Sequence, residues 1–88
     1  MKDKRSLKVH IRYLVYNEFP NYVNGGRIER LAMELGYKAS NSSRRARELH
    51  SEGIFERRIN RGSVEYRYNE DLIPRPVERK VAVEQKLI

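Results

Sequence analysis

The chain contains no cysteine. This absence excludes disulfide bridges, thiolate nucleophiles and cysteine zinc sites together. Long hydrophobic runs are also missing: no segment approaches the roughly 20 apolar residues that a membrane-spanning helix needs. The basic leader, Met1 to Arg5, does not lead into the apolar core of a signal peptide. The sequence therefore predicts a protein of the cytosol, or of the nucleoid in a prokaryote.

Groups typical of an enzyme are scarce as well. His10 and His50 are the only histidines, and neither has a second metal ligand four residues away along a helix. No nucleophile, base and orienting group stand together, and Gly25-Gly26 lacks the spacing of a phosphate-binding loop. The sequence predicts a protein that is not an enzyme and has no metal or cofactor site, although a site assembled from scattered carboxylates stays open.

Positive charge is what the chain has in excess. Its 88 residues contain 19 Lys and Arg against 12 Asp and Glu, which gives a formal net charge of +7. Such a balance favours a polyanionic partner, since bases that neutralise phosphates release condensed counterions. Nucleic acid is the first candidate and an anionic membrane surface the second. A chain of this length forms one domain with a thin core.

The hydrophobic spacing of the first third predicts one helix and a loop. The helix begins after an N-cap at Ser6 and ends near Asn17, ahead of Pro20. Residues 21–26 form a loop that ends in the Gly25-Gly26 break, with Tyr22 and Val23 as candidate residues of a short strand.

Two further helices are predicted with a short turn between them. The first carries an apolar stripe from Ile28 to Leu35 and stops at Gly36 in the left-handed conformation. The second starts near Ser40 or Asn41 and ends at Gly53. Its inner face is formed by Ser42, Ala46 and Leu49. Two helices joined by a glycine-containing turn of this length are typical of a helix-turn-helix.

The period changes from helical to alternating after Ile54. Two strands on either side of a turn at residues 60–63 form a hairpin, and Gly62 supplies the positive φ that a tight turn needs. Tyr66 and Tyr68 are expected in the core, and Arg58 is expected to pair with Glu65 across the hairpin.

The chain after residue 69 is predicted to be a linker and a C-terminal tail. Residues 77–88 suit either a helix or a strand, because their valines fit both periods. We expect this segment to mediate homodimerisation, since the core has no place for it and helix-turn-helix proteins commonly pair on DNA half-sites. A frayed end is the alternative.

Three stretches carry a resemblance to a known family: IERLAMELGY at residues 28–37, SNSSRRAREL at residues 40–49 and EGIF at residues 52–55. They resemble the winged-helix DNA-binding domains of small bacterial, archaeal and phage repressors of the multiple-antibiotic-resistance regulator type. The resemblance implies an α+β fold over residues 1–69, namely a three-helix winged helix-turn-helix with a C-terminal two-stranded β-hairpin wing. Ser42 departs from the family pattern, which has an aliphatic residue under the recognition helix.

The charges of the third helix predict its exposed face. Residues 38–47 contain four bases and no acid, and Glu48 and Glu52 come only near the C-terminal end. This order opposes the helix dipole, at a cost of ~0.3 to 1 kcal/mol per charge, which suggests that the basic end faces an external anion. Arginine, asparagine and serine suit base edges and phosphates. The predicted DNA-binding residues are Lys38, Ser40, Asn41, Ser43, Arg44, Arg45 and Arg47, together with Arg61 at the hairpin turn.

The sequence as a whole predicts a double-stranded DNA-binding protein. We expect a transcriptional regulator, in particular a repressor, that places its third helix in the major groove and its hairpin on the minor groove or backbone. Its partners would be duplex DNA and a second copy of the chain, with no membrane and no small-molecule substrate. Three alternatives stay open: a solvated basic face, a winged helix that docks an acidic protein, and a replication or recombination accessory factor.

Overall fold

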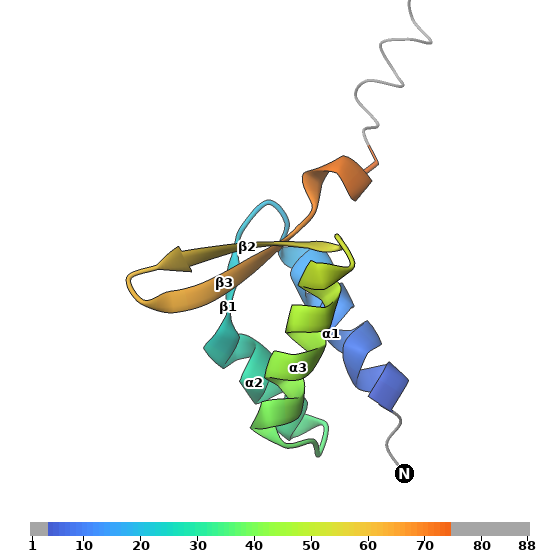
Figure 1. Ribbon diagram of the computed structural model, residues 1–88. Coiled ribbons are helices and arrows are strands. Elements are labelled where there is room, and N and C mark those ends of the chain that lie inside the picture. The colour runs from blue at the N-terminus through green and yellow to red at the C-terminus, as the bar shows by residue number, and fades with distance from the viewer. Residues whose placement is uncertain (1–3, 75–88) are drawn as a thin grey trace, which may run out of the picture.

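The computed structural model describes residues 4–74 of the chain. In this part three α-helices lie together against a three-stranded antiparallel sheet, so the domain is α+β, as expected (Figure 1). Residues 77–88, expected to mediate homodimerisation, lie outside the described residues. The elements in chain order are α1 (Lys4–Glu18), β1 (Val23–Asn24), α2 (Gly25–Glu34), α3 (Ala39–Ser51), β2 (Phe55–Asn60), β3 (Ser63–Tyr68) and the 3₁₀ turn η1 (Glu70–Leu72).

The first helix starts earlier than expected. Ser6 lies inside α1 and is not its N-cap, because Lys4 and Arg5, which are good helix formers, already belong to the helix. The other end, Glu18, falls one residue beyond the expected Asn17. The inward face of α1 is fully buried and consists of Leu7, Ile11 and Val15.

The second helix also starts earlier, at the glycine pair that was expected to close the loop. Asn24 is the N-cap: its Oδ1 accepts a hydrogen bond from the backbone N–H of Arg27 at 2.8 Å. This side-chain cap lets Gly25 begin the helix despite the low helix propensity of glycine. The predicted stop is confirmed, since Gly36 follows the helix with φ of 90°.

The third helix begins at Ala39, one or two residues before the expected Ser40 or Asn41. Its N-cap position is Lys38, whose side chain makes no capping hydrogen bond. The predicted inner face is confirmed: Ser42, Ala46 and Leu49 are each about 1% exposed. The Ser42 hydroxyl donates to the carbonyl oxygen of Ala39, so this polar group is satisfied inside the core.

The expected hairpin is present, but it belongs to a larger sheet. Strands β2 and β3 pair around the two-residue turn Arg61-Gly62, whose φ angles of 53° and 80° fit the left-handed turn that favours tight hairpins. Strand β1 pairs with the other edge of β3, which gives the order β1-β3-β2. The sheet is therefore three-stranded and not the expected two-stranded hairpin, because Val23 and Asn24 lie extended against Tyr66 and Glu65.

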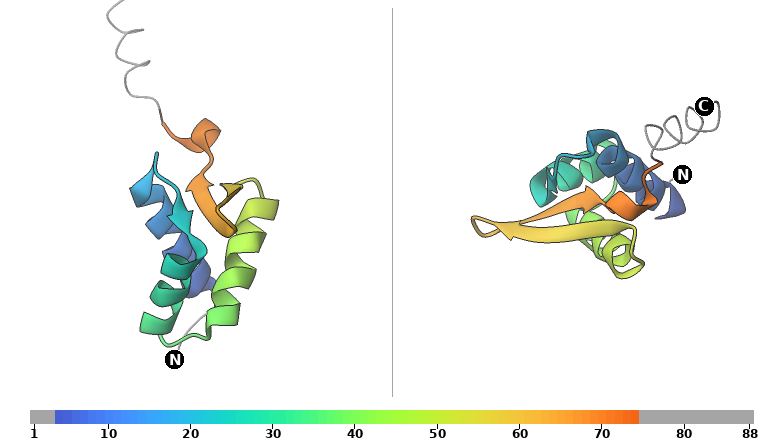
Figure 2. Two further views of the ribbon diagram at one scale, coloured as in Figure 1. Left: turned by 90° about the vertical axis from the view of Figure 1, so that its left-hand side faces the viewer. Right: turned by 90° about the horizontal axis from the view of Figure 1, so that it is seen from above.

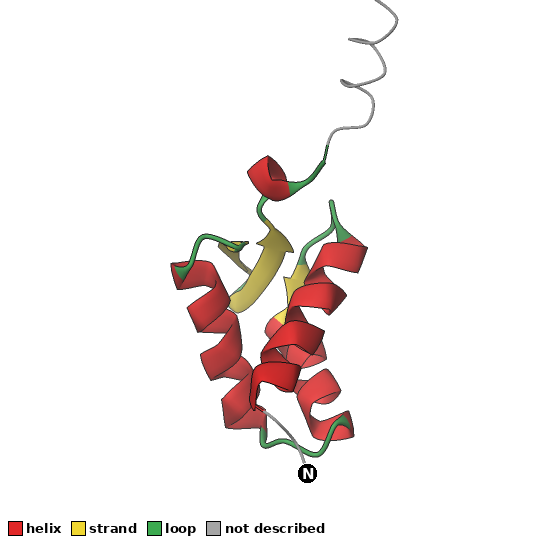
Figure 3. Ribbon diagram, turned by 90° about the vertical axis from the view of Figure 1, so that its right-hand side faces the viewer, coloured by secondary structure: helices red, strands yellow, loops and turns green. Residues whose placement is uncertain are grey.

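The core lies where the three helices meet one face of the sheet. Figure 3 shows the helices around and below the strands, and the far half of the hairpin projects beyond them in the right-hand view of Figure 2. Tyr66 and Tyr68 are 5% exposed, which confirms that they are core residues. Ile73 packs against the same core from beyond η1. No helix of the described part is long and apolar enough to cross a membrane.

Candidate nucleic-acid interface

The predicted site residues lie at two places, the outer face of α3 and the hairpin turn. Most of them are exposed, but Asn41 and Arg45 are half-buried. The inward packing of Ser42, Ala46 and Leu49 fixes this orientation, because side chains on the opposite side of a helix must then face solvent. The exposed predicted residues are Lys38, Ser40, Ser43, Arg44, Arg47 and Arg61.

The acidic residues at the end of α3 are neutralised by α1. The Nζ atom of Lys8 lies 2.6 Å from Glu52 Oε2 and 3.7 Å from Glu48 Oε1. In contrast, no carboxylate of residues 4–74 lies within ion-pairing distance of Arg44 or Arg47. The exposed face of α3 therefore keeps its positive charge, while Glu48 and Glu52 at the end of the helix lie beside Lys8 of α1.

Arg45 differs from the two arginines beside it. Its Nη2 atom lies 3.1 Å from Glu48 Oε2, and its side chain is only 15% exposed. The Nε atom is buried, with no hydrogen-bond partner among the described residues. Arg45 thus turns back along its own helix, and it offers an external ligand less charge and less surface than Arg44 or Arg47 does.

A groove separates α3 from the sheet. Its volume is about 240 Å³, and its lining includes Arg47 from α3 and Arg57 from β2, with Gly25 at the start of α2. No acid of the described residues pairs with Arg57 either. The guanidinium groups of Arg47 and Arg57 line the same groove and repel each other, and an anion bound between them would offset this repulsion. The groove is therefore electrostatically suited to an anionic ligand.

Arg57 was missed by the sequence reasoning, although the strand pattern contained the signal. Alternate residues of a strand share a face, so Phe55, Arg57 and Ile59 point to the same side of β2. Phe55 is buried against the helices, which directs Arg57 toward α3. Arg61 was predicted because it lies at the turn, whereas Arg57 lies in the middle of the strand and was not.

The two faces of the hairpin differ in their charge balance. On the face away from the helices, Arg58 Nε donates to Glu65 Oε1 at 2.7 Å, as predicted, and its guanidinium lies 3.8 Å from the centre of the Tyr22 ring. On the other face and at the turn, Arg57 and Arg61 have no acidic partner among the described residues. The uncompensated charge of the hairpin thus faces the same side as the groove.

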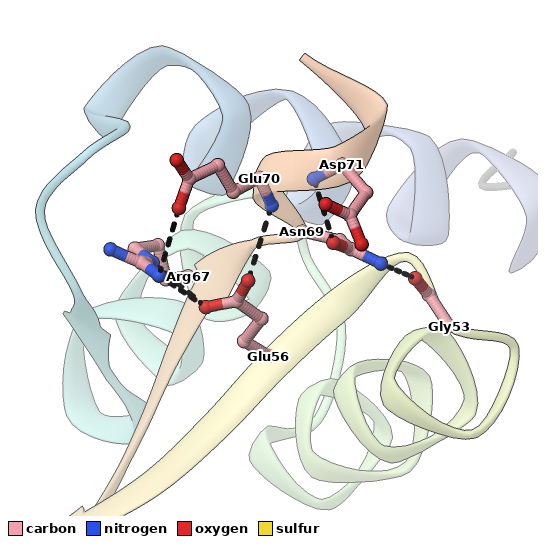
Figure 4. Close-up of polar contacts among 6 residues, drawn as sticks. All are labelled: Gly53, Glu56, Arg67, Asn69, Glu70 and Asp71. Atoms are coloured by element: carbon pink, nitrogen blue, oxygen red, sulfur yellow. Dashed lines mark hydrogen bonds and ion pairs between the residues drawn. The ribbon is translucent and has the colours of Figure 1, made fainter.

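A polar network anchors the base of the hairpin (Figure 4). Arg67 Nε donates to Glu56 Oε1 at 2.9 Å, and the N–H of Glu70 donates to Glu56 Oε2 at 3.2 Å. Asn69 Nδ2 donates to the carbonyl oxygen of Gly53 at 2.8 Å. This network joins β2, β3 and η1, so it holds the hairpin in place relative to the end of α3.

The same contacts shift the pKa values of the central pair. Burial raises the pKa of Glu56, but the hydrogen bonds from Arg67 and from the Glu70 N–H, together with the Arg67 charge, lower it below its ordinary value. The hydrogen bond to Glu56 raises the pKa of Arg67. Both groups are therefore charged at neutral pH, and the positive charge of Arg67 is offset inside the domain.

Candidate metal ligands do not gather in the described part of the chain. Residues 4–74 hold no group of three or more His, Cys, Asp or Glu side chains that could bind an ion. His10 and His50 are both exposed, on α1 and α3.

The chain matches no protein-family model, no curated protein and no solved structure.

Proposed function

We propose that this protein is a winged-helix domain that binds double-stranded DNA and acts as a transcriptional regulator. In this proposal α3 is the recognition helix, the β2–β3 hairpin is the wing, and no residue is catalytic. The observation that carries the proposal is the sorting of charge. Among the described residues, Arg44 and Arg47 on α3 and Arg57 and Arg61 on the hairpin have no acidic partner, whereas Lys8, Arg27, Arg58 and Arg67 are paired with acids. In the same part of the chain, Arg12 on α1 and Arg30 on α2 also lack an acidic partner, but they stand singly on their helices.

The size and chemistry of α3 support an approach to the major groove. Its 13 residues make a helix of roughly 20 Å, and the major groove, about 12 Å wide, admits one α-helix. The residues that α3 exposes there are Ser40, Ser43, Arg44 and Arg47. Arginine can donate two hydrogen bonds to guanine, and serine can bond to either type of base. The half-buried Asn41 is placed beside them and can pair with adenine.

The hairpin supports contacts to the backbone or the minor groove. The hairpin extends beyond the helices (Figure 1). Arg61 lies at its turn, and Arg57 lines the groove beside α3. An inserted arginine is favoured where the minor groove is narrow, because the negative potential is enhanced there. In this proposal Arg57 and Arg61 contact phosphates that lie outside the base pairs contacted by α3.

The test is the salt dependence of binding to short duplexes of random sequence. If five to eight phosphates are contacted, log K should fall with log salt at a slope of about −4 to −7. A slope near zero contradicts the proposal and favours the docking of an acidic protein through local contacts. Selection of bound sequences from a random pool then separates a sequence-specific regulator, which enriches one motif, from an accessory factor that binds any duplex.

Pairing of two domains stays a prediction. One α3 reads only a short site, and two-fold related domains on half-sites about 34 Å apart would gain affinity and specificity. Sedimentation of the protein alone and with a selected duplex measures how many copies bind.

A further inference from the structure

An apolar stripe runs along the outer face of α1. Val9, Tyr13 and Tyr16 follow each other at helical spacing and are 43%, 61% and 40% exposed. They lie opposite the buried face of Leu7 and Ile11. With Arg12 they line a hollow of about 330 Å³, and none of the described residues in that lining is acidic. We call Val9, Arg12, Tyr13 and Tyr16 the α1 stripe.

One end of the α1 stripe is tied to the last strand. The Tyr16 ring meets the Tyr68 ring edge-on, with 5.0 Å between their centres, and Arg12 Nε donates to the Tyr68 hydroxyl at 3.0 Å. These contacts hold Arg12 and Tyr16 in place. Tyr13 makes no such contact with another described residue, so it forms the open centre of the stripe.

The exposed area is too small for a stable contact between two stripes. The two tyrosines and the valine expose roughly 250 Å² together, if a whole tyrosine side chain has about 200 Å². A stable interface needs ~800 Å² from each partner. The stripe therefore cannot hold a second copy of α1 by itself. The same area is sufficient to bind a segment of the same chain, because a short tether keeps that segment at a local concentration in the millimolar range.

The chain beyond η1 starts in the right place to reach this surface. Tyr68 touches Tyr16, and only η1 separates it from Ile73, which packs on the core. In Figures 1 and 2 the chain leaves η1 at the end of the molecule where α1 finishes. The stripe from Val9 to Tyr16 is about 10 Å long at 1.5 Å per helical residue. Residues 75–88 are long enough to cover this length, since 14 residues span roughly 20 Å as a helix and more when extended.

The composition of this segment matches the stripe. Its residues 77–88 carry apolar side chains at Val77, Val81, Val83, Leu87 and Ile88, and their two acids are outnumbered by three bases, so the match is apolar and not one of charge. We propose that residues 77–88 dock on the α1 stripe of their own chain, covering Tyr13. The α1 stripe shares no residue with the groove between α3 and the hairpin that we assign to DNA, so the docking is independent of the proposed function.

The test uses a nitroxide spin label on Gln85→Cys in the full chain, which has no cysteine of its own. The label should broaden the amide NMR signals of Val9, Tyr13 and Tyr16 far more than those of Arg61 and Gly62 at the hairpin turn. A Tyr13→Lys substitution should abolish the broadening. Met33→Lys is the matched control, because Met33 is an apolar residue on α2 with a similar exposure of 57%, and it should leave the broadening unchanged.

Three outcomes would overturn the proposal. Equal broadening of α1 and the hairpin turn, or none at all, means that the segment does not dock on the stripe. Broadening that survives Tyr13→Lys places the segment elsewhere. The last case is docking on a second copy of the chain. To detect it, spin-labelled chain without isotope is mixed at low concentration with isotope-labelled chain that has no spin label. Broadened α1 signals in the isotope-labelled chain would show that the segment binds another copy.

Discussion

Arg57 and Arg58 are neighbours on β2 that point to opposite faces of the sheet, and they give a matched test of the DNA interface. Arg57 lines the groove beside Arg47 and has no acidic partner among the described residues, whereas Arg58 is paired with Glu65 and lies over Tyr22. Replacing either one with alanine lowers the net charge by the same single unit. Any difference between the two variants therefore comes from their positions and not from the overall charge.

The expected magnitudes differ for binding and for stability. Losing one phosphate contact flattens the slope of log K against log salt by about 0.9, which corresponds to a roughly eight-fold weaker affinity at 0.1 M salt. Arg57→Ala should show this loss on every duplex. Arg58→Ala should leave binding nearly unchanged. It loses an ion pair worth ~0.2 to 1 kcal/mol, screened because the Arg58 side chain is 49% exposed, and a ring contact of about 0.5 to 1 kcal/mol.

The assay is fluorescence anisotropy of a labelled duplex titrated from about 50 mM to about 200 mM salt, with thermal unfolding of each variant measured in parallel. Arg58→Ala should melt several degrees lower, since 1 kcal/mol shifts the melting temperature of a domain of this size by about 4 to 8 °C. Arg57→Ala should melt almost like the parent protein. Equal losses of affinity in the two variants would refute the reasoning, because they would show that only net charge matters.

Three further predictions follow from the same geometry. Arg44→Ala should cost ~1 to 3 kcal/mol at a selected site and relax the preference for one base pair; an equal loss on random duplex would make Arg44 a phosphate contact. Arg61→Asn creates the Asn-Gly pair that tight hairpins prefer, so the turn should be stabilised while the salt slope flattens by about one unit on all duplexes. Unchanged binding of that variant would show that the turn stays clear of DNA. Glu56 has a lowered pKa, so its stabilising contribution is present above pH 4.5 and is lost as the pH falls through its folded value. Glu56→Gln should therefore flatten the fall in melting temperature below pH 4.5, and an unaltered acid limb would contradict the assigned network.

The inner faces of the helices could be predicted from the sequence because their periodicity is a local signal. Ile28 and Ala32 on α2, and Ser42, Ala46 and Leu49 on α3, all lie where the spacing places them. Gly36 and Gly53 end their helices with positive φ, as expected. The starts of the helices were predicted less well, because they depend on individual caps such as the bond from Arg27 to Asn24.

The remaining differences come from contacts between distant residues. Val23 was a candidate strand residue and does lie in β1, but its pairing with Tyr66 across the fold could not be predicted, because a run of two residues carries no strand period of its own. Likewise, the neutralisation of Glu48 and Glu52 by Lys8 joins positions about forty residues apart. The exposed face of α3 was predicted, and strand alternation places Arg57 on the side of Phe55, but the groove that brings Arg57 near Arg47 requires the packing of the sheet against α3.

The arrangement of the sheet has a consequence for self-association. In the described sheet, β1 is an edge strand of only two residues, and β2, with six residues, is the long edge strand. Unpaired edges invite strands of other molecules and so promote aggregation, and charged side chains oppose this. Strand β2 carries Glu56, Arg57 and Arg58 in succession. The charges on this strand thus have a second effect, which is to keep the long edge from pairing with another copy. A chain in which Arg57 and Arg58 are both replaced should aggregate at lower concentration than either single variant, even where the fold is intact.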